Sequence, residues 1–434
     1  MISISKLYNG FKAWGDGLRY GEAKEAFARI SIPVKASERK PVVVWNVTRR
    51  CNLYCCHCYS ASENHEYDNE LTTSEGKRLL KDLAGYSVPV VLFSGGEPLM
   101  RNDIFELLHE AQKLALRTVI STNGTLIDNE IAQALKKYGV AYVGVSLDGI
   151  GENNDRFRGK KGAFDAAVKG IEAAARAGLK VGLRLTLTRH TTASLNTIFE
   201  FIKEAPIDRI CFYHLVYSGR GRHLVGDELT HQDTRQIIDA IIDFSYESAR
   251  KGSRKEVLTV DNHVDGVYLY LRMREEGDKE PEKRARAEEV LRLLRWNGGG
   301  LYSTGIGIGA IDSAGNAHPD QFWTHYSPGS VRERQFSEIW QDESDPIMYG
   351  LRHRRDTIRG RCRLCRWFDA CGGSLRVRAE LIYSDPCAPD PACYLSDDEI
   401  GLDNEKRKEL SEPDEIYVVP DFFRSSSHKA GPHV

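Results

Sequence analysis

The sequence predicts an α/β fold, a partial (β/α)6 TIM-like barrel followed by a small C-terminal cysteine-rich domain. From residue 41 onward, short segments that are apolar throughout alternate with longer segments of helical period. Such an alternation indicates a parallel sheet with helices outside it. Polar motifs follow several of the apolar segments, and ten cysteines fall mostly into two compact groups. We therefore expect a barrel whose active site lies at the carboxyl ends of its strands.

The elements follow one another in a regular order after a polar, irregular N-terminal arm over residues 1–40, in which we expect one short helix near 21–29. The expected strands are 42–48, 88–94, 118–123, 142–147, 181–188 and 210–216. The expected helices are 74–84, 104–115, 129–138, 163–177 and 195–204. Six strand-helix units suffice for a partial barrel over 41–230, although a flat doubly wound sheet would show the same periodicity.

The remainder of the chain divides into three parts by composition. Residues 231–296 show helical periods with charged faces, and we expect a helical connection there. Around the Asn-Gly-Gly-Gly stretch at 297–300 the composition shifts to glycine and short β-like segments, which we take as the start of a second domain over 297–403. Residues 404–434 form a polar C-terminal tail whose last ten residues we expect to be flexible.

Composition restricts the classes of function. The chain has 434 residues, 41% of them hydrophobic and 28% charged, with a net charge of -2. This near-neutral balance argues against nucleic acid or a membrane surface as a general partner. We find neither an apolar run long enough to span a membrane nor a signal peptide, so we expect a cytoplasmic protein. Clustered cysteines in such a chain point to metal rather than to disulfides.

The first cysteine group follows directly on the first expected strand. Cys51, Cys55 and Cys58 have the spacing C-x3-C-x2-C and precede Tyr59. Three thiolates can hold three irons of a cubane cluster that normally takes four, which leaves one iron open for chemistry. The alternative is a zinc knuckle or a set of buried thiols, but no second pair of zinc ligands follows in the next forty residues.

Polar motifs end the next strands. Gly95, Gly96 and Glu97 follow the second strand, and the two glycines allow a ligand to approach the backbone closely. The third and fourth strands end in polar residues that also suit ordinary strand-terminal caps. These residues are Ser121, Asn123, Ser146 and Asp148. Because they recur at successive strand ends, they should face the same mouth of the barrel and favour ligand contact.

Arg184 is a charge within an otherwise apolar strand. A buried arginine is rarely left unpaired, so its partner is either a structural acid or a bound anion. Arginine suits a carboxylate in particular, because the guanidinium can bind it in a bidentate way.

The second cysteine group lies near the C-terminus. Cys362, Cys365 and Cys371 have the spacing C-x2-C-x5-C, and Cys393 follows after twenty-one further residues. Four thiolates could bind zinc as a closed structural site. Cys387, on a proline-rich loop, is a rival for the fourth position. Cys56 and Cys211 fit neither group, and we assign them no role.

These motifs together resemble the radical SAM superfamily, in which a C-x3-C-x2-C loop holds a [4Fe-4S] cluster and S-adenosylmethionine (SAM) chelates the fourth iron. The resemblance implies that Gly95, Gly96 and Glu97 bind the amino group of SAM and that Ser146 and Asp148 lie by its ribose. It also implies that Arg184 binds the carboxylate of SAM. The second cysteine group is similar to SPASM or twitch domains, which implies an auxiliary [4Fe-4S] cluster rather than zinc.

Longer stretches resemble the radical SAM enzymes that trim tetrapyrrole side chains. They include residues 41–51, 90–100, 154–159, 214–221 and 390–395. The resemblance implies removal of acetate groups from the iron tetrapyrrole 12,18-didecarboxysiroheme to give iron-coproporphyrin III in the siroheme-dependent haem pathway. It also implies an external electron donor of the flavodoxin or ferredoxin type. A related branch of the family acts in haem d1 biosynthesis and removes propionates instead.

A flat polyanionic substrate needs arginines and aromatic walls. The candidates from the sequence are Arg158, Arg220, Arg222, Tyr213, Trp323 and Tyr326. Histidine could ligate the substrate iron, because neutral imidazole suits iron. The four histidines considered are His214, His263, His318 and His325, of which we expect one or two to matter.

Two other classes of function remain open at the level of the sequence. A peptide-modifying SPASM enzyme would usually carry more C-terminal cysteines. A scaffold protein that delivers iron or haem would not need SAM-type motifs at successive strand ends. Formation of 5′-deoxyadenosine from SAM under anaerobic reduction separates the enzymes from the scaffold.

Overall fold

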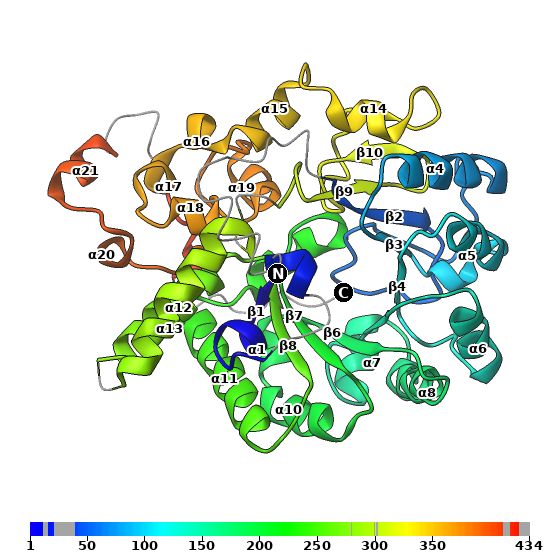
Figure 1. Ribbon diagram of the computed structural model, residues 1–434, viewed down its shortest axis with the longest axis horizontal. Coiled ribbons are helices and arrows are strands. Elements are labelled where there is room, and N and C mark those ends of the chain that lie inside the picture. Colours follow the sequence, from blue (N-terminus) through cyan, green and yellow to red (C-terminus); the bar gives the residue numbers. More distant parts are fainter. Residues whose placement is uncertain are drawn as a thin grey trace.

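A sheet of eleven strands forms the frame of the molecule in the computed structural model (Figure 1). The structure describes residues 1–11, 16–20, 40–278, 280–298, 300, 303–410 and 417–424. The strand order is β1-β8-β7-β6-β5-β4-β3-β2-β9-β10-β11. The strands are β1 (Ile2–Ser3), β2 (Val42–Thr48), β3 (Val91–Gly95), β4 (Thr118–Thr122), β5 (Val143–Ser146), β6 (Val181–Leu187), β7 (Arg209–His214), β8 (Glu256–Val260), β9 (Ile308–Ile311), β10 (Asn316–His318) and β11 (Gly329–Ser330).

The strands from β2 to β8 run parallel, each paired with the next. Helices connect them and cover the outside of the sheet, as Figure 1 shows for α4, α5, α6, α8, α10 and α11. The helices between β2 and β8 are α4 (Thr73–Gly85), α5 (Ile104–Lys113), α6 (Asn129–Lys137), α7 (Glu152–Arg158), α8 (Ala163–Arg176), α9 (Arg189–Thr192), α10 (Leu195–Glu204) and α11 (His231–Arg250). The short 3-10 segments η2 (Pro98–Met100) and η3 (Gly219–Asp227) lie in the loops. The expected partial (β/α)6 barrel is confirmed, with an open rather than a closed sheet.

The periodicity of the sequence located these elements closely. The first strand was expected at 42–48 and is β2, and the helix expected at 195–204 is α10. Local signals also set the helix starts. Thr72 and Glu75 form a reciprocal capping box at the start of α4, and the carboxylate of Asp128 accepts a hydrogen bond from the backbone N–H of Ile131 in α6. Such caps satisfy backbone N–H groups that a helix leaves free at its start.

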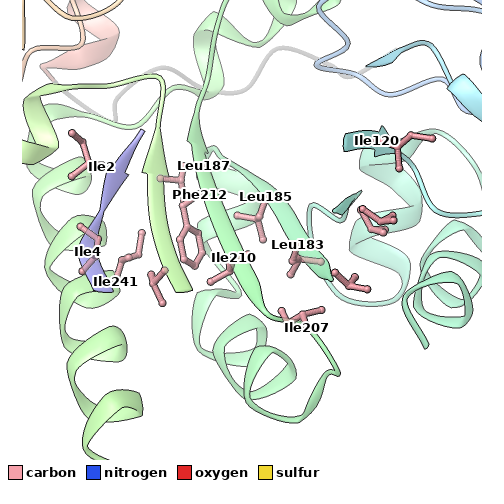
Figure 2. Close-up of a cluster of buried hydrophobic side chains, with 14 of the residues drawn as sticks. Ile2, Ile4, Ile120, Leu183, Leu185, Leu187, Ile207, Ile210, Phe212 and Ile241 are labelled. Atoms are coloured by element: carbon pink, nitrogen blue, oxygen red, sulfur yellow. The ribbon is translucent and has the colours of Figure 1, made fainter. Parts of the chain in front are cut away.

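The two faces of the barrel strands have different surroundings. On β6, the side chains of Leu183, Leu185 and Leu187 are fully buried in the apolar layer between the sheet and its helices (Figure 2). Alternate side chains of a strand point to opposite faces. Arg184 and Thr186 of the same strand therefore face the inside of the barrel, where they line a cavity.

Two expectations about the edges of the barrel were wrong. Residues 231–296 were expected to be helical throughout, but they contain β8, the seventh parallel strand. Residues 1–11 were expected to be part of an irregular arm. Instead Ile2 of β1 pairs with Thr259 of β8, and Ile4 of α1 lies near Ile241 of α11 (Figure 2). The helix expected near 21–29 lies outside the described residues.

Charge conceals β8 in the sequence. Its first residue, Glu256, can be buried despite its charge because it forms ion pairs with Arg209 of β7 and with Arg19. A strand of five residues that begins with a glutamate and lies between two charged helical stretches shows little of the apolar pattern used to find strands. The ion pair between Glu256 and Arg209, which allows this strand to be buried, joins residues 47 positions apart and cannot be found from a local sequence pattern.

The C-terminal part extends the sheet instead of standing apart from it. Strand β9 pairs in parallel with β2, and β10 and β11 continue from it antiparallel. The boundary expected at 297 stays a prediction, but the sheet runs across it. The helices from β8 onward are α12 (Val264–Glu276), α13 (Pro281–Leu293), α14 (Phe336–Gln341), α15 (Pro346–Arg352), α16 (Arg354–Thr357), α17 (Gly360–Leu364), α18 (Phe368–Cys371), α19 (Arg376–Tyr383), α20 (Asp397–Ile400) and α21 (Asn404–Glu409).

The short N-terminal helices α1 (Ile4–Leu7) and α2 (Asp16–Tyr20) flank the edge strand β1. Near the other end of the chain, residues 417–424 return to the barrel, and Phe423 is buried with Phe157, Leu215 and Tyr217. The expected polar tail thus carries an apolar anchor. Within the described residues we find no helix that has both the length and the apolar character of a membrane span.

Candidate active site

The loop after β2 gathers the first three cysteines. The side chains of Cys51 and Cys55 are buried together, and Cys58 packs against them. Backbone hydrogen bonds fix the loop, from the N–H of Cys51 to the carbonyl of Glu63 (3.0 Å) and from the N–H of Cys56 to the carbonyl of Phe157 (3.0 Å). Burial raises the pKa of Cys51 to about 12, and the neighbouring Glu97, Cys55 and Cys58 add to the shift.

Each of the three sulfur atoms accepts a hydrogen bond. Asn123 Nδ2 lies 3.9 Å from the Sγ of Cys51, and Arg158 Nη1 lies 3.6 Å from the Sγ of Cys55. The backbone N–H of Ser62 donates to Cys58 Sγ at 3.5 Å. Donors of this kind stabilise negative charge on sulfur and tune iron–sulfur sites. The surroundings therefore fit three cluster thiolates.

The partners of Asp148 are other residues of the protein. Its carboxylate is fully buried, forms an ion pair with Arg158, and accepts a hydrogen bond from the backbone N–H of Thr186 (2.7 Å). His57 Nε2 lies 3.6 Å from the same carboxylate. Arg158 therefore links Asp148 to Cys55, an arrangement that the sequence did not indicate because the three residues are widely separated. The expected contact between Asp148 and the SAM ribose stays a prediction.

The two glycines after β3 make room for the backbone of the cysteine loop. A Cβ atom on Gly95 would lie 2.2 Å from the carbonyl oxygen of Thr48, and one on Gly96 would lie 2.3 Å from that of Arg50. The N–H groups of Gly96 and Glu97 donate to these carbonyls at 2.8 Å each. Glycine is required here because any side chain would separate the two turns.

Glu97 itself turns inward and is fully buried. Its carboxylate accepts hydrogen bonds from Thr122 Oγ1 (2.8 Å), the N–H of Asn123 (2.7 Å) and the N–H of Leu99 (3.1 Å). Burial raises the pKa of Glu97 to about 7 against the opposite effect of these bonds. It thus ties β3 to the end of β4, and its expected contact with the SAM amino group stays a prediction.

A cavity of about 450 Å³ occupies the inside of the barrel next to the cysteine loop. Its walls include Ser121, Ser146 and Arg184, three of the residues expected to contact SAM. His57 and Tyr59, on either side of Cys58, also line it. Its volume lies within the range of small-molecule sites.

Arg184 is one of several charged residues that line this cavity. Its Nη1 donates to Ser121 Oγ at 2.5 Å, while its Nε is buried without a hydrogen-bond partner. Gly144 on β5 makes space for it, because a Cβ there would lie 2.5 Å from Arg184 Nε. Within the described ranges, Arg184 forms no ion pair with a carboxylate. A half-buried guanidinium that faces a cavity and lacks a carboxylate partner is suited to bind an anion.

The arginines expected to bind substrate have other partners. Arg220 donates from Nε to the carbonyl of Cys55 (2.8 Å) and from Nη1 to that of Ser62 (2.9 Å), so it supports the cysteine loop. Arg222 is exposed beside His223. Tyr213 lines the cavity as expected, whereas Trp323 packs beside His325 and Tyr326.

The four candidate histidines differ in their partners. His214 Nε2 lies 2.9 Å from the buried Asp265, and His325 Nε2 lies 2.9 Å from Glu380. The two ring nitrogens of His318 lie near the carbonyl of Tyr326 (2.6 Å) and the carboxylate of Asp312 (3.5 Å). Of the four, His214 and His263 line the cavity.

The second cysteine group assembles from α17, α18 and the loops around them. Burial raises the pKa of the thiols of Cys362, Cys365 and Cys371, and for Cys371 the next largest causes are Cys393, Cys362 and Cys365. Cys393 therefore acts on the pKa of Cys371 together with Cys362 and Cys365, as expected of thiols that belong to one group. The grouping favours Cys393 as the fourth ligand.

Cys387 has different neighbours. Its N–H donates to Asp385 Oδ1 at 2.8 Å, and it borders a separate cavity of about 150 Å³.

All ten cysteines have free thiols. Among the residues that the structure describes, no three His, Cys, Asp or Glu side chains converge on one point as single-ion ligands would. A cubane spreads its thiolates around four irons, so both groups remain suited to it.

Comparison with known proteins agrees with this geometry. Residues 45–202 match the sequence model of the radical SAM superfamily, which covers β2 to α10. Fe-coproporphyrin III synthase of Methanosarcina barkeri is 51% identical over 92% of this chain and 99% of its own length. Pre-heme d1 synthase of Dinoroseobacter shibae is 39% identical over 83% of this chain and 88% of its own length.

Solved structures confirm the fold. The crystal structure of Streptococcus suis SuiB bound to S-adenosylmethionine superimposes with a TM-score of 0.63 at 21% identity, covering 82% of this chain and 78% of SuiB. At this identity the likeness concerns the fold alone. The sequence relatives decide the family, since the match to the synthase spans almost the whole of both chains. The chain therefore belongs to the radical SAM superfamily and, within it, to the same family as Fe-coproporphyrin III synthase.

Proposed function

We propose that this enzyme removes the two acetate side chains of 12,18-didecarboxysiroheme and so forms iron-coproporphyrin III. It does so in the cytoplasm with electrons from a flavodoxin- or ferredoxin-type donor. The 51% identity to Fe-coproporphyrin III synthase over nearly the full length of both chains is the observation that carries the choice of substrate. The class of reaction is supported by Arg184, which lines the cavity beside the three-cysteine loop and has no carboxylate partner in the described residues.

The chain's own residues fit the two groups that the reaction requires. Cys51, Cys55 and Cys58 would hold three irons of the [4Fe-4S] cluster, which leaves one iron for SAM. Cys56 of the same loop lies outside the C-x3-C-x2-C spacing and is not counted among the ligands. When bound, cluster and SAM supply a 5′-deoxyadenosyl radical for hydrogen abstraction. Arg184 would bind the SAM carboxylate, since its free Nε and the Nη groups suit a bidentate anion. Ser121 keeps the guanidinium in position.

The surroundings of these residues control access and charge. Tyr59 donates from its hydroxyl to Asn46 Oδ1 at 2.9 Å, which holds its ring in the cavity wall next to the cysteine loop. Apolar and aromatic side chains such as Val44, Leu92 and Phe322 line much of the remaining wall. A wall of this kind excludes water from a reactive intermediate. Cys362, Cys365, Cys371 and Cys393 would hold the auxiliary cluster outside the cavity.

A single anaerobic assay tests the proposal. The reconstituted enzyme is incubated with SAM, dithionite and 12,18-didecarboxysiroheme, and the tetrapyrrole products are separated and weighed by mass spectrometry. Loss of two acetates supports the proposal, and loss of propionates would assign the chain to the haem d1 branch instead. An unchanged tetrapyrrole together with formation of 5′-deoxyadenosine would reject this substrate and keep the reaction class. The Cys55→Ala variant serves as the inactive control.

A further inference from the structure

One histidine that lines the cavity, His263, has a ring with no hydrogen-bond partner in the described part of the chain. His263 follows β8 and lies at the carboxyl ends of the strands, and it is 7% exposed. Its Nδ1 is buried without a hydrogen-bond partner, and Nε2 makes no hydrogen bond to any residue in the described part of the chain. A largely buried ring with neither nitrogen bonded to the protein is rare, because buried polar atoms normally have partners. Since Nδ1 is enclosed and His263 lines the cavity, Nε2 is the nitrogen that a ligand in the cavity could reach.

The neighbouring histidines do not share this property. His214 lines the same cavity, but its Nε2 is engaged by Asp265, whose other oxygen accepts a hydrogen bond from Tyr394 (2.8 Å). His57 also lines the cavity, with Nε2 near Asp148 and Nδ1 buried. Among these three rings, His263 alone presents an unengaged Nε2.

The backbone around His263 is held in a strained conformation. Asp261 and Ser374 both adopt left-handed backbone angles, with φ of 65° and 57°. The N–H of His263 donates to Ser374 Oγ at 3.1 Å, and that hydroxyl donates to Asn262 Oδ1 at 3.0 Å. Non-glycine residues keep such angles only where the surroundings enforce them, and this happens often at functional sites. The backbone that carries the ring is therefore held in place by the protein itself.

The same turn is attached to the auxiliary cysteine group. Asn262 Nδ2 donates to the carbonyl of Ala392 (3.1 Å), next to Cys393. Gly300 fills the space between the ring and α18, because a Cβ there would lie 2.8 Å from His263 Cγ and 1.9 Å from the carbonyl oxygen of Cys371. His263 thus stands between the barrel cavity and the second cysteine group.

We propose that His263 binds the iron of the tetrapyrrole substrate as an axial ligand through Nε2, an inference that rests on the proposed function. A neutral imidazole donates a lone pair to iron, and burial holds the pKa of His263 well below its usual value, so that the ring is neutral. Ligation would fix the tetrapyrrole plane against a rigid turn. It would also place the substrate iron on the side of the cavity that faces the auxiliary cysteines.

The test uses the reconstituted full-length enzyme and ferric iron-coproporphyrin III as the probe. Titration under anaerobic conditions is followed by absorption and EPR spectroscopy. We expect the wild-type complex to show an imidazole-ligated iron and His263→Ala to lack it. We also expect His263→Ala to bind the probe more weakly, by at least the roughly 10- to 100-fold that loss of a supporting partner of a metal ligand costs. Added imidazole should restore the spectrum of this variant.

Further variants separate loss of the ligand from damage to the fold. His263→Met keeps a ligand of a different kind and should change the spectrum rather than abolish the interaction. His325→Ala, which lies outside the cavity, should leave it unchanged. Identical spectra for the wild type and His263→Ala would overturn the assignment, as would loss of the imidazole signal in His214→Gln only. If the wild type bound no probe at all, the proposed substrate would fall together with this inference, whereas binding with an unchanged spectrum rejects the ligand alone.

Discussion

The two cysteine groups of this enzyme differ in number, origin and surroundings. The first comes from one loop of eight residues, Cys51–Cys58, and its three sulfur atoms accept hydrogen bonds from side chains and backbone at the mouth of the barrel. The second gathers four thiols from a stretch of thirty-two residues, Cys362–Cys393, within packed helices and loops. The first borders the cavity, through His57 and Tyr59, and no member of the second lines it.

This difference indicates how one kind of cofactor can take two roles. A loop with three thiols that opens on a cavity leaves an iron for a small molecule. Four thiols away from the cavity, one buried and three half-buried, would form a closed site, which is typical of a structural or electron-transfer role. Residues around the thiols, more than the thiols themselves, distinguish the two sites. The following predictions test this contrast.

The largest effect is expected for Cys55→Ala. Loss of one of three thiolates should abolish SAM cleavage, because the first cluster cannot form with two protein ligands. Iron content should fall by roughly four atoms per chain, and 5′-deoxyadenosine should be absent from an anaerobic assay. Cys56→Ala, a neighbour in the same loop, should keep both iron and cleavage. Full cleavage by Cys55→Ala would contradict the assignment of the first site.

Arg184→Met should weaken SAM binding strongly. The guanidinium is half-buried and lacks a carboxylate partner in the described part of the chain, so the SAM carboxylate would lose a charge-assisted hydrogen bond worth about 1.5–3 kcal/mol, or roughly 10- to 150-fold in affinity. Anaerobic calorimetry with SAM measures this change directly.

Two matched variants frame that experiment. Arg184→Lys keeps the charge without the planar fork and should bind SAM with intermediate affinity. Arg176→Met removes an exposed arginine of α8 and should have no effect. Unchanged affinity in Arg184→Met would mean that the anion in this cavity is not SAM.

The second cysteine group should show a smaller effect on the first reaction step. Cys393→Ala should remove the auxiliary cluster while sparing part of the SAM cleavage, because the first site is held by other residues. Tetrapyrrole conversion should fall more than 5′-deoxyadenosine formation. Cys387→Ala is the matched control, since its thiol borders a different cavity. If Cys387→Ala lost the auxiliary iron and Cys393→Ala retained it, the ligand assignment would have to be exchanged.

The smallest effect concerns the contribution of Glu97 to the stability of the folded protein. The pKa of Glu97 is raised from 4.5 to about 7, so folding favours its protonated form. The stability contributed by this group is fully present below pH 4.5 and is lost as the pH rises through 7. Glu97→Gln should therefore flatten the change in thermal midpoint between pH 5 and pH 8. Glu106→Gln, on an exposed part of α5, is the control. A pH dependence equal to that of the wild type would show that Glu97 does not titrate in this range.

Sequence periodicity predicted most strands and helices of the barrel, and cysteine spacing predicted the two cysteine groups. The strand preceding Cys51 was located to the residue, because it is apolar throughout and bounded by polar turns. Arg184 was singled out as a charge within an apolar strand. The pairing of Arg158 with Asp148 and Cys55 was not foreseen, since only the fold brings α7 next to the cysteine loop. His263 could be named as one of four histidines, but its lack of a partner is a property of the packing.

The pairing of β9 with β2 has a mechanical consequence. Four residue pairs, from Val42 with Ile308 to Trp45 with Ile311, join the strand that leads into the first cysteine loop to the region that carries the second group. Since a ladder of backbone hydrogen bonds rather than a flexible linker joins the two strands, the start of the C-terminal region is fixed against the barrel. Amide protons of β2 and β9 should then exchange with solvent at similar rates, as those of one cooperative unit do.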